Sequence, residues 1–217
     1  MNCNLLVVGV GGQGVMTAAE VLARAAFEAG FDVTKTEVAG MSQRGGVVCS
    51  QVRIGRVVQA AEIEPGTAHL LLALEAAELL RWCHWLKAGG DALVNTARVI
   101  PPIVNSGLAR YPADPAGEAR SLGYAVRSID ASSIAAALGE PRLANSVMLG
   151  AAADRLPVAA EALLAQLLGR FAGNARLARL NAAAFAQGRQ AAARSGTPCV
   201  PAAPCTPASL TSSVGAR

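Results

Sequence analysis

Residues 4–36 read NLLVVGVGGQGVMTAAEVLARAAFEAGFDVTKT, and this stretch decides the fold. A short apolar strand over residues 4–8 runs directly into a glycine-rich turn. A helix is expected over residues 15–29, because apolar residues recur there at spacings of three and four. Its expected buried face consists of Val15, Ala18, Ala19, Leu22 and Ala26. Gly30 closes the helix, and a second strand follows over residues 31–36. This order of strand, helix and strand predicts a βαβ unit.

Strands and helices alternate through the rest of the chain. Strands over 47–54 and 57–63 flank Gly55-Arg56 and predict a hairpin. Gly89-Gly90 is expected to interrupt regular structure, and Pro101-Pro102 to open an irregular stretch that runs through Pro112. The other expected strands are 68–74, 92–95 and 124–130, and the other expected helices are 75–86, 132–138, 143–155, 157–171 (with Pro157 in its first turn) and 175–194.

This alternation predicts an α/β, Rossmann-like fold with helices on both faces of the sheet and a helical C-terminal part. The sheet is expected to be mostly parallel, or mixed where the hairpin adds an antiparallel element. Residues 1–194 are expected to form a single domain. Residues 195–217 are rich in Pro, Ser, Thr and Ala without periodicity, so we expect a disordered tail there.

The composition excludes several classes of protein. Hydrophobic residues make up 53% of the 217, which is ample for a core, but aromatics make up only 4%, which disfavours a single-strand nucleic-acid binder. The net charge of +4 comes from scattered arginines, which favours a solvated helix face over a nucleic-acid patch. With no apolar run of 18 residues and no signal-peptide pattern, we expect a cytoplasmic protein with neither a membrane nor a nucleic-acid partner.

Cysteine and histidine spacing argues against metal ligation by this chain. The five cysteines are scattered and contain no C-x-x-C pair, so a cubane iron–sulfur cluster or a structural zinc is not expected. His69 and His84 lie far apart in sequence, and a buried or interfacial role is the better interpretation for each. We therefore predict that the chain alone binds no metal and no cofactor.

Gly9, Gly11 and Gly14 satisfy the pattern G-x-G-x-x-G between a strand and a helix. Glycines there let the backbone approach a phosphate closely, and the helix that follows directs its positive end at the anion. Glu37 lies 23 residues beyond Gly14, where a carboxylate can bind a ribose hydroxyl. The pattern indicates a dinucleotide site, and a tight turn that binds nothing is the alternative.

Two features of the sequence are not typical of an NAD-dependent dehydrogenase. Gln13 adds an amide donor and acceptor at the mouth of the turn, and Ser42-Gln43-Arg44-Gly45-Gly46 forms a second polar, glycine-containing loop. Arg44 can hold a phosphate or carboxylate in a fork, or form a surface ion pair with Glu37 or Glu62. Both loops follow strands of the first unit and should meet at one sheet edge, where they suit an extended anionic ligand or a partner surface.

Catalytic side chains are not evident. The sequence contains no G-x-S-x-G, no P-loop lysine and no H-E-x-x-H. Glu75 can face the ligand edge or cap its helix, and the cap is the preferred interpretation. Asp130 is expected to cap the helix after it. Trp82 and Trp85, three residues apart on one helix, indicate a packing or subunit contact.

Several motifs together resemble the gamma-type domain of 2-oxoacid:ferredoxin oxidoreductases, most closely the beta subunit of the indolepyruvate type. They are VGVGGQGV (8–15), EVAGMSQRGG (37–46), SQVRIG (50–55), LLALE (71–75), Gly89-Gly90 and NSVMLG (145–150). The resemblance covers roughly residues 4–190. The loop at 41–46 joined to the Gly-Gln-Gly turn is far more specific than the glycines alone.

The resemblance implies a subunit that is inactive by itself. Thiamine diphosphate, Mg and 4Fe-4S clusters are expected on a separate larger alpha subunit, which passes electrons to ferredoxin. The implied reaction is the oxidative decarboxylation of an aryl pyruvate with coenzyme A as co-substrate, giving an acyl-CoA, CO2 and reduced ferredoxin. This chain is expected to shape the coenzyme A side of the active site.

The resemblance also suggests site residues. Gly11, Gly12, Gln13 and Gly14 are expected to line an anion site, with Ser42, Gln43, Arg44 and Gly45 completing it or contacting the alpha subunit. No residue is assigned a covalent catalytic role. The alternatives are an NAD-binding Rossmann dehydrogenase or regulatory module, and a structural module whose glycine turn binds nothing.

Overall fold

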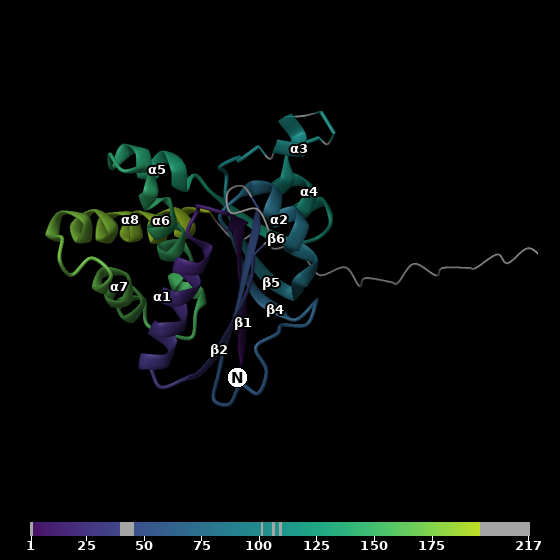
Figure 1. The fold of residues 1–217 in the computed structure, drawn as a ribbon. Helices are drawn as coiled ribbons and strands as arrows, with labels where there is room; N and C mark the ends of the chain where they lie inside the picture. The colour runs from purple at the N-terminus through teal and green to yellow at the C-terminus, as the bar shows by residue number, and fades with distance from the viewer. Residues whose placement is uncertain (1, 40–45, 101, 106, 109, 196–217) are drawn as a thin grey trace, which may run out of the picture.

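The computed structural model describes residues 2–39, 46–100, 102–105, 107–108 and 110–195, and these residues build a six-stranded sheet (Figure 1). In spatial order the strands are β2 (Asp32–Ala39), β3 (Val47–Gly55), β1 (Cys3–Val10), β4 (Ala68–Ala73), β5 (Leu86–Asn95) and β6 (Ala125–Ile129). β1, β4, β5 and β6 run parallel, whereas β3 is antiparallel to both β1 and β2. The predicted α/β class with a mixed sheet is confirmed.

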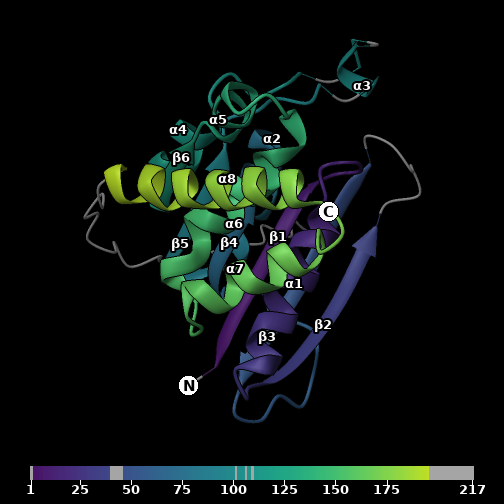
Figure 2. The same ribbon diagram turned by 90° about the vertical axis from the view of Figure 1, so that its left-hand side faces the viewer.

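Helices cover both faces of this sheet (Figures 1 and 2). On one face lie α1 (Val15–Glu28), α5 (Ala131–Ala137), α6 (Ala144–Ala152), α7 (Ala160–Gly169) and α8 (Ala175–Arg194). On the other lie α2 (Ala76–Trp82) and α4 (Pro115–Ser121), while α3 (Pro102–Asn105) stands out from the sheet's carboxyl edge. Short 3-10 turns occupy Cys83–Trp85, Pro141–Leu143 and Ala153–Arg155. The larger hydrophobic core lies between the sheet and the α1 side.

The first unit folds largely as its sequence predicts. All five residues expected on the buried face of α1 are buried, and Gly30 has the positive φ of 85° that ends a helix. β1 and β2 are parallel, as a βαβ unit requires. They are not neighbours, however, because β3 lies between them and pairs with each.

The predicted hairpin at 47–63 is wrong in its second strand. Both edges of β3 are already paired, so a strand over 57–63 has no free edge to join. The segment is irregular, and side chains bind its backbone instead. Arg53 donates to the carbonyl oxygens of Ala60 and Glu62, Val58 N–H donates to Asp32, and Ile63 N–H donates to Gln51 Oε1 at 2.6 Å.

Other boundaries also differ from the predictions. β5 runs through Gly89-Gly90 instead of stopping there, with a register shift against β4 that absorbs the extra residues. Pro157 precedes α7 and is not in its first turn. The stretch from Pro101 contains the short α3. The strand β6, the Asp130 cap of α5 and the bounds of α8 agree with the predictions. Residues 196–217 of the predicted tail lie outside the described residues.

Two glycines allow α6 and α8 to cross in close contact. A Cβ atom on Gly188 would lie 1.9 Å from the carbonyl oxygen of Val147, and one on Gly150 would lie 2.0 Å from that of Phe185. Real Cβ atoms do not approach backbone this closely, so any larger residue must push the two helices apart. This crossing holds α6, and with it Asn145, at the carboxyl edge of the sheet.

We predict that Gly188→Ala lowers the free energy of unfolding by about 3 kcal/mol, because the methyl group overpacks a backbone contact. Urea denaturation measures the effect. Gly169→Ala is the matched control, since a Cβ there meets nothing within 4 Å and the change should be within about 1 kcal/mol of neutral. Equal stability of Gly188→Ala and wild type would contradict the close crossing.

Candidate functional site

The glycine turn after β1 has the backbone conformation that the sequence requires. Gly12 and Gly14 have φ values of 99° and 80°, in the left-handed region that side chains disfavour. Gly14 immediately precedes α1, so the positive end of the helix dipole lies at the turn. At Gly9 φ is ordinary, but a Cβ atom would lie 2.7 Å from Gln13 Oε1. The three glycines therefore serve a tight turn packed against its own side chain.

Gln13 ties this turn to the neighbouring strand. Its Oε1 accepts a hydrogen bond from Val10 N–H at 3.0 Å, and its Nε2 donates to the carbonyl oxygen of Leu74 at 3.1 Å. The side chain thus joins the carboxyl ends of β1 and β4. The amide predicted at the mouth of the turn has both of its polar atoms engaged with backbone, so it positions the turn.

Two asparagines from distant elements complete the arrangement. Asn145 Nδ2, on α6, donates to the carbonyl oxygens of Gln13 at 3.0 Å and Gly14 at 2.8 Å. Asn95 Nδ2, at the end of β5, donates to Leu74 O and to Ser132 Oγ, each at 3.3 Å. Neither asparagine is among the predicted site residues, although Asn145 opens one of the motifs that carry the family resemblance.

The second predicted loop ends beside the turn. Val10 pairs with Val47 across β1 and β3, and Gly11 N–H donates to Gly46 O at 2.9 Å. The expected proximity of the two loops at one sheet edge is confirmed for these ends. Ser42, Gln43, Arg44 and Gly45 lie outside the described residues, so their predicted roles stay predictions.

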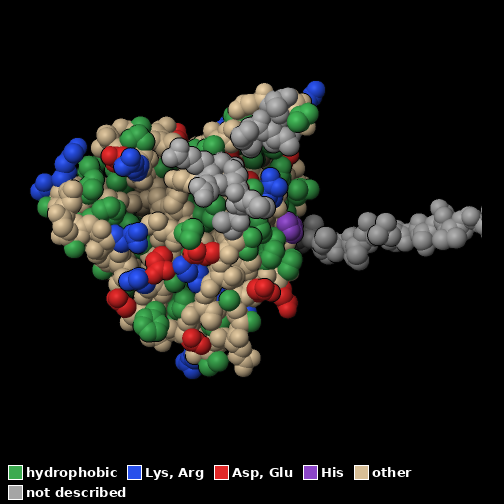
Figure 3. Space-filling view, in the orientation of Figure 1, with side chains coloured by type: hydrophobic (Ala, Val, Ile, Leu, Met, Phe, Trp, Pro, Cys, Tyr) green, Lys and Arg blue, Asp and Glu red, His purple; other side chains and the backbone are tan. Residues whose placement is uncertain are grey.

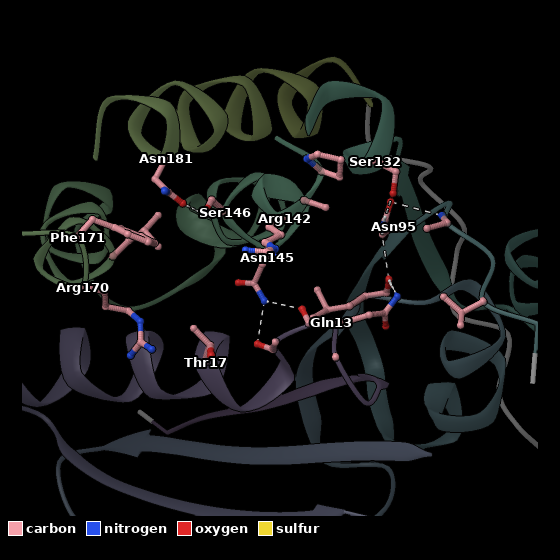
Figure 4. A pocket seen from close by; sticks show the side chains of 18 residues that line it. Gln13, Thr17, Asn95, Ser132, Arg142, Asn145, Ser146, Arg170, Phe171 and Asn181 are labelled. Atoms are coloured by element: carbon pink, nitrogen blue, oxygen red, sulfur yellow. Dashed lines mark hydrogen bonds between the residues drawn. The ribbon is translucent and has the colours of Figure 1, made fainter. Parts of the chain in front are cut away.

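A pocket of about 520 Å³ opens between the glycine turn and the helices of the C-terminal part (Figure 4). The first helix α1 and the turn form one wall, and α5 to α8 with their connections form the other. Its lining is mainly apolar, but it includes two arginines. The residues that line the pocket include Gly12, Gln13, Gly14, Thr17, Leu74, Asn95, Val99, Ser132, Arg142, Asn145, Ser146, Leu167, Arg170, Phe171 and Asn181.

Glu75 anchors the loop beside this pocket. Its side chain is only 1% exposed, and it accepts hydrogen bonds from Ala77 N–H at 2.7 Å and Glu78 N–H at 3.0 Å, which confirms the predicted cap of α2. It also accepts from Val99 N–H at 3.1 Å and from the Tyr111 hydroxyl. Burial and the hydrogen bond to Glu75 raise the pKa of Tyr111, so its hydroxyl remains a donor at neutral pH.

Glu37, proposed as a ribose ligand, does not reach the turn. It lies on β2 and pairs with Lys35 at 2.7 Å, while Lys35 also contacts Glu20 of α1 at 2.9 Å. Because β3 separates β2 from β1, the two parallel strands are about 10 Å apart, twice the usual strand spacing. In a NAD-binding unit the first two strands are adjacent, and in this chain they are not.

The tryptophans lie on the opposite face of the sheet. The rings of Trp82 and Trp85 have their centroids 5.6 Å apart, and Trp82 Nε1 donates to Glu78 Oε2 at 3.1 Å. Burial raises the pKa of the Glu78 carboxyl despite its contact with Arg81. In the described ranges, no three His, Cys, Asp or Glu residues gather into a possible metal site, and no helix is long and apolar enough to span a membrane. On the face that Figure 3 shows, Lys and Arg side chains are interspersed with Asp and Glu side chains.

Comparison with known proteins places this geometry in a family. The model of the pyruvate ferredoxin/flavodoxin oxidoreductase family matches residues 4–191. The chain belongs to this family. Indolepyruvate oxidoreductase subunit IorB of Archaeoglobus fulgidus is 43% identical over 152 residues, which are 69% of this chain and 75% of that protein.

Solved structures of other oxidoreductases share the fold. A 2-oxoglutarate:ferredoxin oxidoreductase from Magnetococcus marinus aligns with a TM-score of 0.71 at 20% identity, over 89% of this chain. The present chain spans only 31% of that longer one. The gamma subunit of a keto/oxoacid ferredoxin oxidoreductase from Geobacter sulfurreducens aligns with a TM-score of 0.63 at 25% identity, over 88% of this chain and 99% of that one.

The residues that line the pocket come from widely separated parts of the sequence. The glycine turn lies near residue 12, whereas Arg142, Asn145 and Arg170 follow more than a hundred residues later. The glycine pattern marks the turn in the sequence. No local motif marks the two arginines, so they are not among the predicted site residues.

We predict that Asn145→Ala destabilises the protein by about 2 kcal/mol, because the carbonyl oxygen of Gln13 loses its donor and that of Gly14 keeps only the backbone N–H of Ala18. Faster amide hydrogen exchange at residues 11–15 than in wild type should accompany the loss. Gln190→Ala, at an exposed position of α8, is the control and should leave both measurements unchanged. Wild-type exchange in Asn145→Ala would show that the turn holds its conformation unaided.

Proposed function

We propose that the chain is the small subunit of an indolepyruvate-type 2-oxoacid:ferredoxin oxidoreductase. The complex carries out oxidative decarboxylation of an aryl pyruvate with coenzyme A, giving an acyl-CoA, CO2 and reduced ferredoxin. The observation that carries this proposal is the 43% identity to a protein named indolepyruvate oxidoreductase subunit, extending over three quarters of that protein. The coenzyme A bound to the structurally similar Magnetococcus oxidoreductase supports the choice of acyl acceptor.

The chemistry is divided between subunits. Thiamine diphosphate, Mg and the 4Fe-4S clusters belong to a larger alpha subunit, and ferredoxin receives electrons from the complex in the cytoplasm. The present chain contributes one wall of the coenzyme A side. Its glycine turn, fixed by Gln13 and Asn145, presents backbone and the positive end of α1 to an anion, while the loop at 42–45 completes the site. No residue of this chain forms a bond to substrate.

The alpha subunit covers the carboxyl edge of the sheet in this proposal. Five of the eight exposed large apolar side chains of the described residues lie there, around the glycine turn and the loop that Glu75 anchors. These are Met16, Val38, Val99, Ile100 and Leu108. Exposed apolar residues gathered at one site are typical of a protein interface. The other three, Phe27, Val57 and Leu122, belong to segments at the opposite edge.

Reconstitution tests the proposed function. The purified chain should show no turnover by itself, and adding a thiamine- and cluster-bearing alpha subunit should restore dye reduction that depends on both an aryl pyruvate and coenzyme A. Turnover of a 2-oxoacid by the chain alone would overturn the assignment. So would tight NAD(H) binding by the chain that is lost in Glu37→Ala, which is the outcome expected for an NAD-binding dehydrogenase.

A charge at the carboxyl edge should weaken assembly. Leu108 is 81% exposed, so Leu108→Glu leaves the fold intact but places a carboxylate where the alpha subunit packs, and we expect the dissociation constant of the complex to rise at least about tenfold. Leu122→Glu is the matched control, since Leu122 is 66% exposed at the opposite edge. Analytical ultracentrifugation or biolayer interferometry measures both. Equal affinity of the two variants would place the interface elsewhere.

A further inference from the structure

One edge of the sheet is open to a further strand. β2 is the outermost strand and pairs with β3 over all eight of its residues, without a register shift (Figure 2). No other strand of the described residues pairs with it. Alternate backbone N–H and C=O groups of an antiparallel edge strand point away from its one neighbour. The free edge of β2 therefore offers a row of main-chain donors and acceptors to another strand.

The opposite edge of the sheet is better protected. β6 is only five residues long, and Arg120 Nε donates to the carbonyl oxygen of Val126 at 3.2 Å. The same guanidinium group donates to Ser128 Oγ at 2.8 Å. Short strands and charged side chains laid on the backbone are usual protections of a sheet edge. β2 is longer, contains no proline and has no bulge in its ladder, so its edge remains a template for pairing.

The charged side chains of β2 lie on the face of the sheet that α1 covers. Lys35 Nζ lies 2.7 Å from Glu37 Oε1 and 2.9 Å from Glu20 Oε2 of α1. Charges on an edge strand usually repel an incoming strand. Here, however, one positive and one negative side chain stand two residues apart on the same face. A strand with the same two charges in reverse order would find an opposite charge at each of them.

The other face of β2 carries residues without charge. Thr34 points to this face, because its Oγ1 donates to the carbonyl oxygen of Ala60 at 3.2 Å in the segment that follows β3. Thr36 and Val38 share the face by the alternation of a strand. Val38 is 57% exposed. Threonine and valine are well suited to cross-strand contacts.

We propose that the free edge of β2 binds the same edge of a second copy of this chain, in antiparallel orientation and with a two-fold axis at Thr36. In this register, Lys35 of each copy lies opposite Glu37 of the other. Thr36 lies opposite Thr36, and Thr34 lies opposite Val38. All of these pairs are favourable cross-strand neighbours.

The charges select this register over its neighbours. A shift by two residues in one direction places Lys35 opposite Lys35, and in the other direction it places Glu37 opposite Glu37. A shift by one residue turns every side chain to the wrong face. The edge is therefore complementary to itself in one register, which favours a second copy over an unrelated strand as its partner.

This pairing leaves the carboxyl edge of each sheet accessible. Because the two β2 strands run antiparallel, the carboxyl edges of the two copies point in opposite directions. Each glycine turn, and the pocket beside it, stays open to its own alpha subunit. The inference concerns the isolated chain and does not rest on the proposed function.

Sedimentation equilibrium of the full chain is the first test. Wild type should dimerise reversibly with a micromolar dissociation constant, as a small polar interface does. Lys35→Glu and Glu37→Lys should each raise this constant at least about tenfold, because like charges then face each other at two positions. Arg176→Glu, at an exposed position in the first turn of α8, is the matched charge reversal and should dimerise as wild type does. Circular dichroism and thermal melting verify that the variants fold.

A mixture of the two single variants tests the register. In a mixed dimer, the carboxylate introduced at position 35 of one chain faces the ammonium group introduced at position 37 of the other. The mixture should therefore dimerise with an affinity close to that of wild type, and so should the double variant by itself. A mixture that stays monomeric would overturn the proposed pairing. A wild-type chain that is monomeric at all concentrations would overturn it as well, as would single variants that dimerise like wild type.

Hydrogen exchange identifies the surface that is covered. Alternate amides of residues 33–38 should exchange more slowly at high protein concentration than at low concentration, whereas exchange in β6 should not depend on concentration. Protection of β2 that develops only when the alpha subunit is added would assign this edge to that subunit and overturn the inference.

Discussion

The hydrogen bonds made by three side-chain amides at the carboxyl edge of the sheet are the constraint on which the rest of the structure depends. Gln13 and Asn95 both donate to the carbonyl oxygen of Leu74, so the ends of β1, β4 and β5 converge on one acceptor. Asn145 adds two hydrogen bonds from α6 to the turn and thereby positions the C-terminal helices relative to it. The pocket exists because these bonds hold its two walls together while leaving the space between them open.

The position of β3 determines which residues lie beside the glycine turn at the carboxyl edge of the sheet. By pairing with both β1 and β2, it separates the acidic residue at the end of β2 from the glycine turn. The glycine pattern is shared with dinucleotide-binding proteins. In this chain, however, the turn lies beside the loop that ends at Gly46 and not beside the acidic residue of β2. The same turn geometry can therefore serve a ligand other than a dinucleotide, in agreement with the oxidoreductase family to which the chain belongs.

The molecule concentrates its functional features on one side. The glycine turn, the pocket, the loop anchored by Glu75 and five of the eight exposed large apolar side chains of the described residues share the carboxyl edge. In the longer Magnetococcus oxidoreductase the same fold makes up less than a third of the chain. A small domain that presents a pocket and an apolar surface together is suited to pack against a partner subunit, and the relatives of this chain are named as subunits.

The sequence by itself determined the local features: the glycine turn, the buried face of α1, the caps at Glu75 and Asp130, the bounds of α8 and the family resemblance. These follow from spacing and residue type over a few neighbouring residues, which is the range over which helix periodicity and capping act. The tertiary structure alone determines that β3 inserts between β1 and β2, that residues 57–63 form no strand, and that Arg142 and Arg170 line the same pocket as the glycine turn. Such outcomes depend on which strand edges remain free and on how α6 packs against α8 and the turn. Those contacts join segments that are separated in the sequence, by as many as 132 positions for Asn145 and Gln13, so no local pattern records them.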